Sequence, residues 1–172
     1  MLTKDFIQET LIEGIGRMTI GSDYLASNAY IGFSLVCQAI EVLGACFDEY
    51  DWEDRYLSEL RFRLAIKKLF PEKCITFNDK KAQFDLYKNL RCPMVHQMRP
   101  GKYIGLSQRK HEKAANVSNL HLSMQDKHLV LIYEDFFGDF RQACQMLIKM
   151  IDDKKFQAEK VYGHNISVPS DV

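Results

Sequence analysis

The stretch that decides the fold is Ile31-Gly-Phe-Ser-Leu-Val-Cys-Gln-Ala-Ile-Glu-Val-Leu-Gly-Ala-Cys-Phe47. Its apolar residues cover more than one face of a helix, which is typical of a helix buried at the centre of a domain. Ser34, Gln38 and Glu41 interrupt it, so it is too short and too polar to span a bilayer. We expect it to be the core of a longer helix over residues 23–49.

Glu41 is the unusual residue of this helix, because it is flanked by Ile40 and Val42. An ionised carboxylate is costly to bury unless a cation or a hydrogen-bond donor faces it. We therefore expect Glu41 to be at least partly buried and paired. An arginine from the central part of the chain is the expected partner.

Apolar residues at three- to four-residue spacing predict further amphipathic helices on both sides of the core helix. These helices are expected over residues 4–16, 53–69, 79–92 and 133–155. Residues 97–118 are polar and basic and predict a long loop or flap. Alternation in 120–132 is compatible with a small β-hairpin. The predicted fold class is all-α, a helical bundle of four to five helices with at most that hairpin.

The chain of 172 residues is long enough for one hydrophobic core, so we expect one domain over 1–158 and a tail over 159–172. The residues from Met1 to Phe6 lack the pattern of a signal peptide. The five cysteines are odd in number and include no Cys-x-x-Cys pair, which is typical of free thiols in a reducing compartment. These features predict a cytoplasmic protein with no membrane association.

The formal net charge is zero, but the charge is distributed in blocks. Residues 1–54 carry 2 lysines and arginines against 10 acidic residues, 55–115 carry 15 against 5, and 116–172 carry 6 against 8. Two interpretations remain open. Either the acidic and basic blocks neutralise each other within one surface, or the basic middle third attracts a polyanion.

Motifs for metals and nucleotide cofactors are absent from the sequence. There is no phosphate-binding loop and no His-Glu-x-x-His, and His111, His121 and His128 have no further ligands at metal-binding spacing. We expect these histidines to be surface or packing residues. The sequence therefore predicts no cofactor and no metal.

The chemical signal of the sequence is Arg91-Cys-Pro-Met-Val-His96. On an ideal helix, residues five apart are rotated by about 140°, so the two side chains would diverge. Pro93 lacks an amide donor, so the helix should kink or restart between them and turn both toward one cleft. An imidazole transfers protons near neutral pH, and a guanidinium donates two parallel hydrogen bonds to a phosphate. Alternatively, Arg91 pairs with a buried acid such as Glu41 and His96 caps or packs a helix end, or Cys92 is a thiol nucleophile.

The Arg-x-x-x-x-His spacing at the end of an amphipathic helix, in a helical domain without metal or cofactor motifs, resembles the HEPN superfamily. Members of that superfamily include metal-independent RNases of toxin–antitoxin, abortive-infection and CRISPR systems. In strict motif terms the resemblance covers Arg91 to His96, and in architecture residues 4–155. It implies a homodimer in which two Arg91–His96 pairs face each other across a shared cleft. Active members usually place Asn, Asp or His directly after the arginine, whereas this chain has Cys92.

The function expected from this resemblance is that of a metal-independent endoribonuclease, as a toxin or defence effector held in check by an antitoxin-like partner. Arg91 would clamp the phosphate and His96 would transfer protons. The residues expected to bind the RNA substrate are Arg99, Lys102, Arg109 and Lys110. The alternatives are a catalytically inactive helical interaction module of the same fold and a small-ligand or nucleotide sensor.

Overall fold

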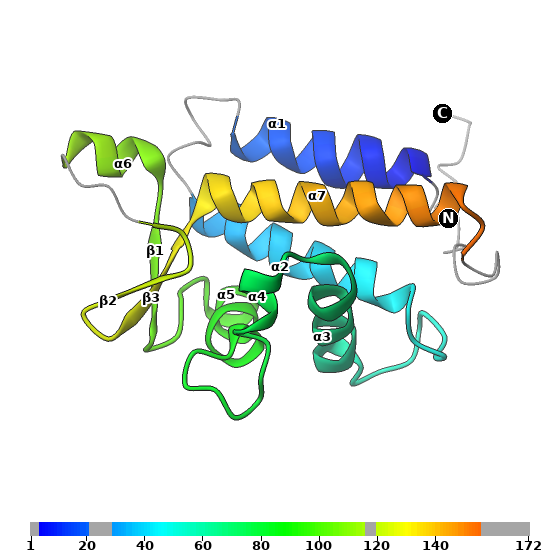
Figure 1. The fold of residues 1–172 in the computed structure, drawn as a ribbon, viewed down its shortest axis with the longest axis horizontal. Coiled ribbons are helices and arrows are strands. Elements are labelled where there is room, and N and C mark those ends of the chain that lie inside the picture. The colour runs from blue at the N-terminus through cyan, green and yellow to red at the C-terminus, as the bar shows by residue number, and fades with distance from the viewer. Residues whose placement is uncertain (1–3, 21–28, 116–119, 156–172) are drawn as a thin grey trace, which may run out of the picture.

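The computed structural model describes residues 4–20, 29–115 and 120–155. Three helical segments run side by side along its long axis (Figure 1). They are the π-helical segment η1 (Phe6–Gly14) with its continuation α1 (Ile15–Thr19), α2 (Ala29–Ala45) and α7 (Tyr133–Asp152). Within the described residues, no helix combines the length and the apolar composition needed to cross a membrane.

A second set of helices lies across α2. It consists of α3 (Ser58–Leu69), the short α4 (Glu72–Ile75), the π-helical turn η2 (Tyr87–Arg91) and α5 (Cys92–Gln97). The backbones of α2 and α3 touch at Gly44, where a Cβ atom would lie 1.7 Å from the carbonyl oxygen of Arg61. Only a residue without a side chain fits there, so Gly44 sets how closely the two helices approach.

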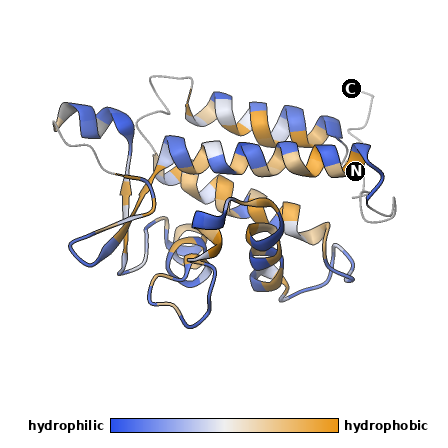
Figure 2. Cartoon of the chain, in the orientation of Figure 1, coloured by the Kyte–Doolittle hydropathy of each residue, from blue (hydrophilic) through white to orange (hydrophobic). Residues whose placement is uncertain are grey.

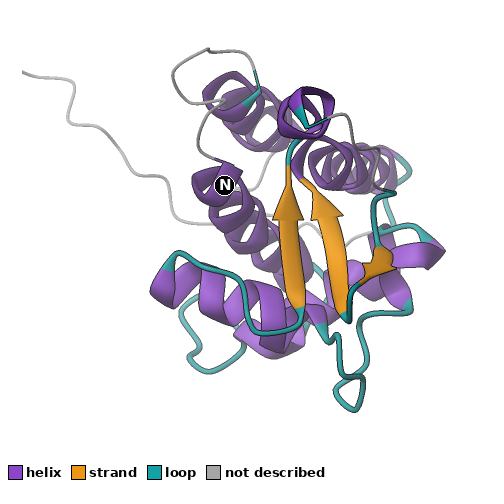
Figure 3. Ribbon diagram, turned by 90° about the vertical axis from the view of Figure 1, so that its left-hand side faces the viewer, coloured by secondary structure: helices purple, strands orange, loops and turns teal. Residues whose placement is uncertain are grey.

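A three-stranded sheet covers one end of the helices (Figure 3). Its strands are β1 (Ile104–Ser107), β2 (Ser123–Gln125) and β3 (His128–Ile132), in the order β1-β3-β2. The β2–β3 pair is the antiparallel hairpin compatible with the sequence, but β1 pairs with β3 in parallel, with Ile104 opposite Leu129. The all-α prediction is therefore wrong: the chain is mainly helical with a small mixed sheet. A four-residue strand whose partner lies 25 residues away leaves no local periodic signal.

Several predicted boundaries also need correction. The loop predicted over 97–118 contains β1 and the short helix α6 (Arg109–Ala114). The helix predicted over 79–92 begins only near Tyr87, and the residues before it form turns. The Asp85 carboxylate accepts the Tyr87 N–H at 3.0 Å and so caps the start of the helix. α3 begins at Ser58 rather than at residue 53.

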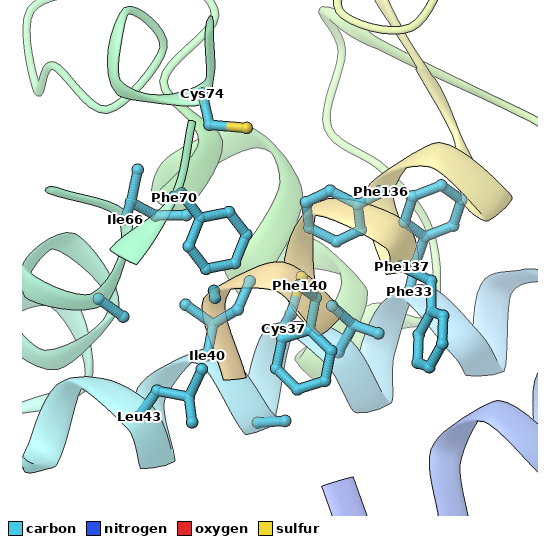
Figure 4. Packing of buried hydrophobic residues seen from close by; sticks show 14 of the residues in the cluster. Phe33, Cys37, Ile40, Leu43, Ile66, Phe70, Cys74, Phe136, Phe137 and Phe140 are labelled. Atoms are coloured by element: carbon cyan, nitrogen blue, oxygen red, sulfur yellow. The ribbon is translucent and has the colours of Figure 1, made fainter. Parts of the chain in front are cut away.

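The core helix is confirmed, although it ends earlier than predicted. Of the range 23–49, the structure places Ala29–Ala45 in α2, and residues 23–28 lie outside the described part, as does the expected tail. Phe33, Ile40 and Leu43 of α2 are fully buried, and α7 packs against them with apolar residues (Figure 4). Hydrophilic residues of these helices face outward (Figure 2). Burying each such side chain contributes about 1.5–3 kcal/mol.

A buried polar cluster ties the sheet to α4 and α7. The Asp139 carboxylate on α7 lies 2.9 Å from Nζ of Lys73, 3.3 Å from Nε2 of His121 and 3.6 Å from Sγ of Cys74. The backbone N–H of Ile132 donates to Nδ1 of His121 at 3.1 Å. His121 is thus a packing histidine, as predicted, and it joins β3 to α7.

Candidate functional site

The two residues of the sequence motif lie where the helix changes geometry. The π-helical turn η2 ends at Arg91, and α5 begins at Cys92 with Pro93 in its first turn. Because Pro93 has no amide hydrogen, the carbonyl of Asn89 loses its α-helical partner, and it accepts the N–H of Gly101 at 2.7 Å instead. A Cβ atom on Gly101 would lie 2.8 Å from that carbonyl oxygen. The backbone stays helical through Arg91 and Cys92, and it changes there from π-helical to α-helical geometry instead of the predicted kink or restart.

The two side chains lie close together across this change of geometry. Nη1 of Arg91 lies 3.5 Å from Nε2 of His96, although the guanidinium is buried and His96 is exposed. A guanidinium has only hydrogen-bond donors, so a hydrogen bond at this contact has Nε2 of His96 as its acceptor.

Glu41 holds the Arg91 guanidinium from the opposite side. Nε of Arg91 donates to Oε1 of Glu41, and the two side chains are only 10% and 15% exposed. Burial alone lowers the pKa of Arg91, but the hydrogen bond to Glu41 outweighs it and raises the pKa above its ordinary value. The expectation that Glu41 is buried and paired with a central arginine is confirmed.

Tyr87 and Cys92 form the other wall of the motif. The guanidinium carbons of Arg63 and Arg91 each lie 5.6 Å from the centre of the Tyr87 ring. Burial, together with a hydrogen bond to Cys92, raises the pKa of Tyr87 to about 12. Among the described residues, the half-buried Cys92 thiol thus interacts with Tyr87 and not with His96.

Arg91 also lines a pocket of about 510 Å³ between α2 and the segment that leads into α3. Its other lining residues include Glu41, Trp52, Arg55, Tyr56 and Arg61. The pocket wall is held in place by Arg61. Its Nε donates to Oδ2 of Asp48 at 2.7 Å, and its Nη atoms donate to the carbonyls of Asp51 at 2.6 Å and Trp52 at 3.3 Å.

Two ion pairs at this pocket show how part of the acidic block of the chain meets the basic block. Asp48 and Glu41 belong to the acidic first third of the chain, and they pair with Arg61 and Arg91 of the basic middle third. The interpretation that the blocks neutralise each other therefore holds for these buried residues. The exposed lysines and arginines of the middle third are not accounted for in this way.

The residues predicted to bind substrate are divided between two places. Arg99 and Lys102 follow α5; Nε of Arg99 donates to Gln97 at 2.9 Å, and Nζ of Lys102 lies 5.4 Å from the centre of the Tyr103 ring. Arg109 and Lys110 belong to α6, which follows the end of β1 away from α5 (Figure 1).

Arg109 has a structural role in that place. It binds Glu112 at 2.9 Å, and it also binds Asp135. The structure therefore does not bring Arg109 and Lys110 to the Arg91–His96 pair.

Sequence reasoning missed the residues of the pocket wall. The helix predicted over 53–69 includes Arg55 and Tyr56, yet these residues precede α3 and line the pocket together with Trp52. The available signal was the presence of several aromatic residues and an arginine in a short, otherwise acidic connection. Trp52 packs partly against the core, whereas Tyr56 is exposed, which favours a binding role for Tyr56.

Within the described residues, no three His, Cys, Asp or Glu side chains are grouped as ligands for a metal ion. Comparisons of the chain with protein-family models, with curated proteins and with solved structures gave no match. Function is therefore inferred from the contacts of the site alone.

Proposed function

We propose that this protein is a metal-independent endoribonuclease of HEPN type, in which Arg91 binds the phosphate and His96 transfers protons. The observation that carries the proposal is the contact between a buried, fixed guanidinium and an exposed imidazole. Nη1 of Arg91 lies 3.5 Å from Nε2 of His96, while Glu41 occupies Nε of the same guanidinium. Such a pair places a proton acceptor beside a phosphate-binding group.

The chemistry follows from these atoms. The imidazole of His96 takes the proton of the RNA 2′-hydroxyl, and the 2′-oxygen then attacks the adjacent phosphorus. The bond from phosphorus to the 5′-oxygen breaks, and the 5′-oxygen leaves with a proton. The products are a 2′,3′-cyclic phosphate and a 5′-hydroxyl end. Because Glu41 binds Nε of Arg91 and His96 contacts Nη1, Nη2 and the second hydrogen of Nη1 are left to stabilise the charge on the phosphorane.

A homodimer is part of this proposal. One imidazole accepts the proton of the nucleophile, and a second acid is needed for the leaving oxygen. A second copy of the chain would supply another His96 across a two-fold axis. In the cell, the proposed role is that of a toxin or defence effector that an antitoxin-like protein holds in check.

A second candidate is a catalytically silent helical interaction module. Burial of Arg91 and its ion pair with Glu41 favour this candidate, because the same contacts connect α2 to η2 in a purely structural role. Cys92 favours it as well. Active members of the family resembled usually have Asn, Asp or His directly after the arginine, whereas the Cys92 thiol interacts with Tyr87.

The test is RNA cleavage by the purified protein in the presence of a chelator. We expect cleavage of unstructured RNA with 2′,3′-cyclic phosphate ends, and a loss of about 100-fold or more in rate for His96→Ala. His96 is exposed, so this variant should stay folded. His128→Ala, which removes another exposed histidine, is the matched control and should keep full activity.

Two results would favour the silent module instead. One is a folded protein that is dimeric by light scattering and leaves varied RNAs intact. The other is cleavage that survives His96→Ala, since the proposed proton acceptor would then be dispensable.

A further inference from the structure

Tyr56 has a conformation and an exposure that folding does not explain. Its side chain is 98% exposed, and its φ angle of 66° lies in the left-handed region, which is unfavourable for residues with a Cβ atom. An exposed aromatic ring gains nothing from burial within the chain. The ring of Tyr56 is therefore available to a partner outside the chain.

Tyr56 stands between two pockets, and a third adjoins them. The pocket that contains Arg91 and a pocket of about 470 Å³ on the other side of Tyr56 are both lined by this residue. The second pocket shares Glu59, Arg63 and Lys80 with a third one of about 310 Å³. We call this continuous row of three pockets along α3 the α3 groove.

The exposed charged side chains that line the α3 groove are mainly positive. They include the cations Arg55, Lys67, Lys80 and Lys88. The Glu59 carboxylate is bound by Arg63 at 2.9 Å and by Lys80 at 3.1 Å, so the charges of Glu59 and Lys80 offset each other in part. Asp54 is the exposed acid of the groove, and its carboxylate accepts the N–H of Asp51 at 3.0 Å.

One end of the α3 groove reaches the proposed catalytic pair. Arg91 and Val95 line the first pocket, and His96 is the next residue of α5. A chain of nucleotides in the groove would therefore pass the guanidinium that contacts His96. A groove lined by exposed cations, with an aromatic ring on which a base can stack, is typical of proteins that bind single-stranded nucleic acid without strict sequence preference.

We propose that the α3 groove binds single-stranded RNA, with a base stacked on Tyr56 and the backbone phosphates beside Arg55, Lys67 and Lys80. The pocket next to Arg91 receives the nucleotide adjacent to the bond that is cut. This inference rests on the proposed ribonuclease function for the substrate, but it assigns binding to residues other than the catalytic pair. It also moves substrate binding away from Arg109 and Lys110.

The experiment measures binding separately from cleavage. Fluorescence anisotropy with a labelled, unstructured RNA of about ten nucleotides would be recorded on the His96→Ala variant, which cannot cut in the proposed mechanism. In that background, Tyr56→Ala should weaken binding about tenfold, and Tyr56→Phe, which keeps the ring, should bind within about twofold of the parent. Lys80→Ala should weaken binding and reduce its salt dependence.

Matched controls lie outside the α3 groove. Tyr30→Ala removes another exposed tyrosine, at the opposite end of α2, and Lys149→Ala removes an exposed lysine on α7. Both should leave RNA binding unchanged. Equal losses in the control and groove variants would overturn the proposal, because binding would then be a general effect of charge and surface.

Failure of this inference can be told apart from failure of the proposed function. If the wild type cleaves RNA and Tyr56→Ala binds RNA normally, the groove assignment is wrong and the nuclease stands. If Tyr56→Ala loses binding while His96→Ala still cleaves, the groove stands and the catalytic assignment is wrong. If RNA does not bind and Tyr56→Ala instead prevents dimer formation, the groove is a protein interface and the inference is overturned.

Discussion

Nε of Arg91 donates a hydrogen bond to Glu41, 50 residues earlier in the chain, and this ion pair links α2 to the turn η2. The contact gives Arg91 a structural role in addition to its proposed catalytic one. His96 has no such role, because its side chain is exposed in the last turn of α5. Substitutions at the two residues should therefore have different effects on stability.

Arg91→Ala should lower the free energy of unfolding by about 3–5 kcal/mol, because it leaves the Glu41 carboxylate buried without its cation. His96→Ala should change it by less than about 0.5 kcal/mol. Urea unfolding followed by circular dichroism measures both. Equal stabilities for the two variants would contradict the ion pair.

The double variant Glu41→Leu with Arg91→Met should recover most of the stability that Arg91→Ala loses. Removing both charged partners leaves no uncompensated charge, so a buried ion pair replaced by apolar residues of similar size is about neutral in free energy. Unfolding of the double variant and of both single variants gives the coupling energy. A double variant as unstable as the sum of the single variants would show that the two residues do not interact.

Tyr56→Gly should be more stable than Tyr56→Ala by about 1 kcal/mol, although both variants lose the ring. The reason is the positive φ of this position, which costs alanine but not glycine. Thermal unfolding of the two variants measures the difference. If alanine is the more stable replacement, the backbone at Tyr56 does not hold the left-handed conformation in solution.

Asp139 should make stability depend on pH in the acidic range. Burial alone raises the pKa of this carboxyl, but the hydrogen bonds from His121 and Lys73 outweigh it and lower the pKa below its ordinary value of 3.8. A lowered pKa in the folded state contributes stability that is present above 3.8 and is lost as the pH falls through the lowered value. Asp139→Asn should cost about 2–4 kcal/mol near pH 7 and much less in strong acid. Urea midpoints measured across this range would test it, and an equal cost at both ends would contradict it.

Gly44→Ala should lower the free energy of unfolding by about 3 kcal/mol or more, because its Cβ atom would lie 1.7 Å from a backbone oxygen of α3. Gly138→Ala in α7 is the matched control. A Cβ atom there meets nothing within 4 Å, and alanine favours the helix by about 0.5–1 kcal/mol. Unfolding midpoints that move in the same direction for both variants would contradict the close contact of α2 and α3.

Local patterns predicted the parts of the fold that depend on near neighbours. The apolar run around Phe33 and Leu43 gave the core helix, and the isolated Glu41 gave a buried ion pair. Parts that depend on distant partners were missed. Ile104 pairs with Leu129, and the Asp85 carboxylate binds Arg63, 22 residues earlier, as well as the start of its own helix.

The candidate site shows the same division. The contact of Arg91 with His96 was predictable because Pro93 lies between them in sequence. The α3 groove was not, because it requires α2, α3 and the residues before α3 to be positioned in space. Arg109 was predicted to bind substrate from charge alone, and its acidic partner Asp135 lies in a distant helix.

The burial of the cysteines makes the unmodified chain suitable for labelling at one position. Cys37, Cys46, Cys74 and Cys144 are buried, whereas Cys92 is partly accessible. Burial raises the pKa of Cys74 to about 12 and raises those of Cys37 and Cys144 as well, so these thiols form little of the reactive thiolate. A maleimide dye should therefore attach first at Cys92. It would sit in the third pocket of the α3 groove, where its emission can report on ligands without any engineered cysteine.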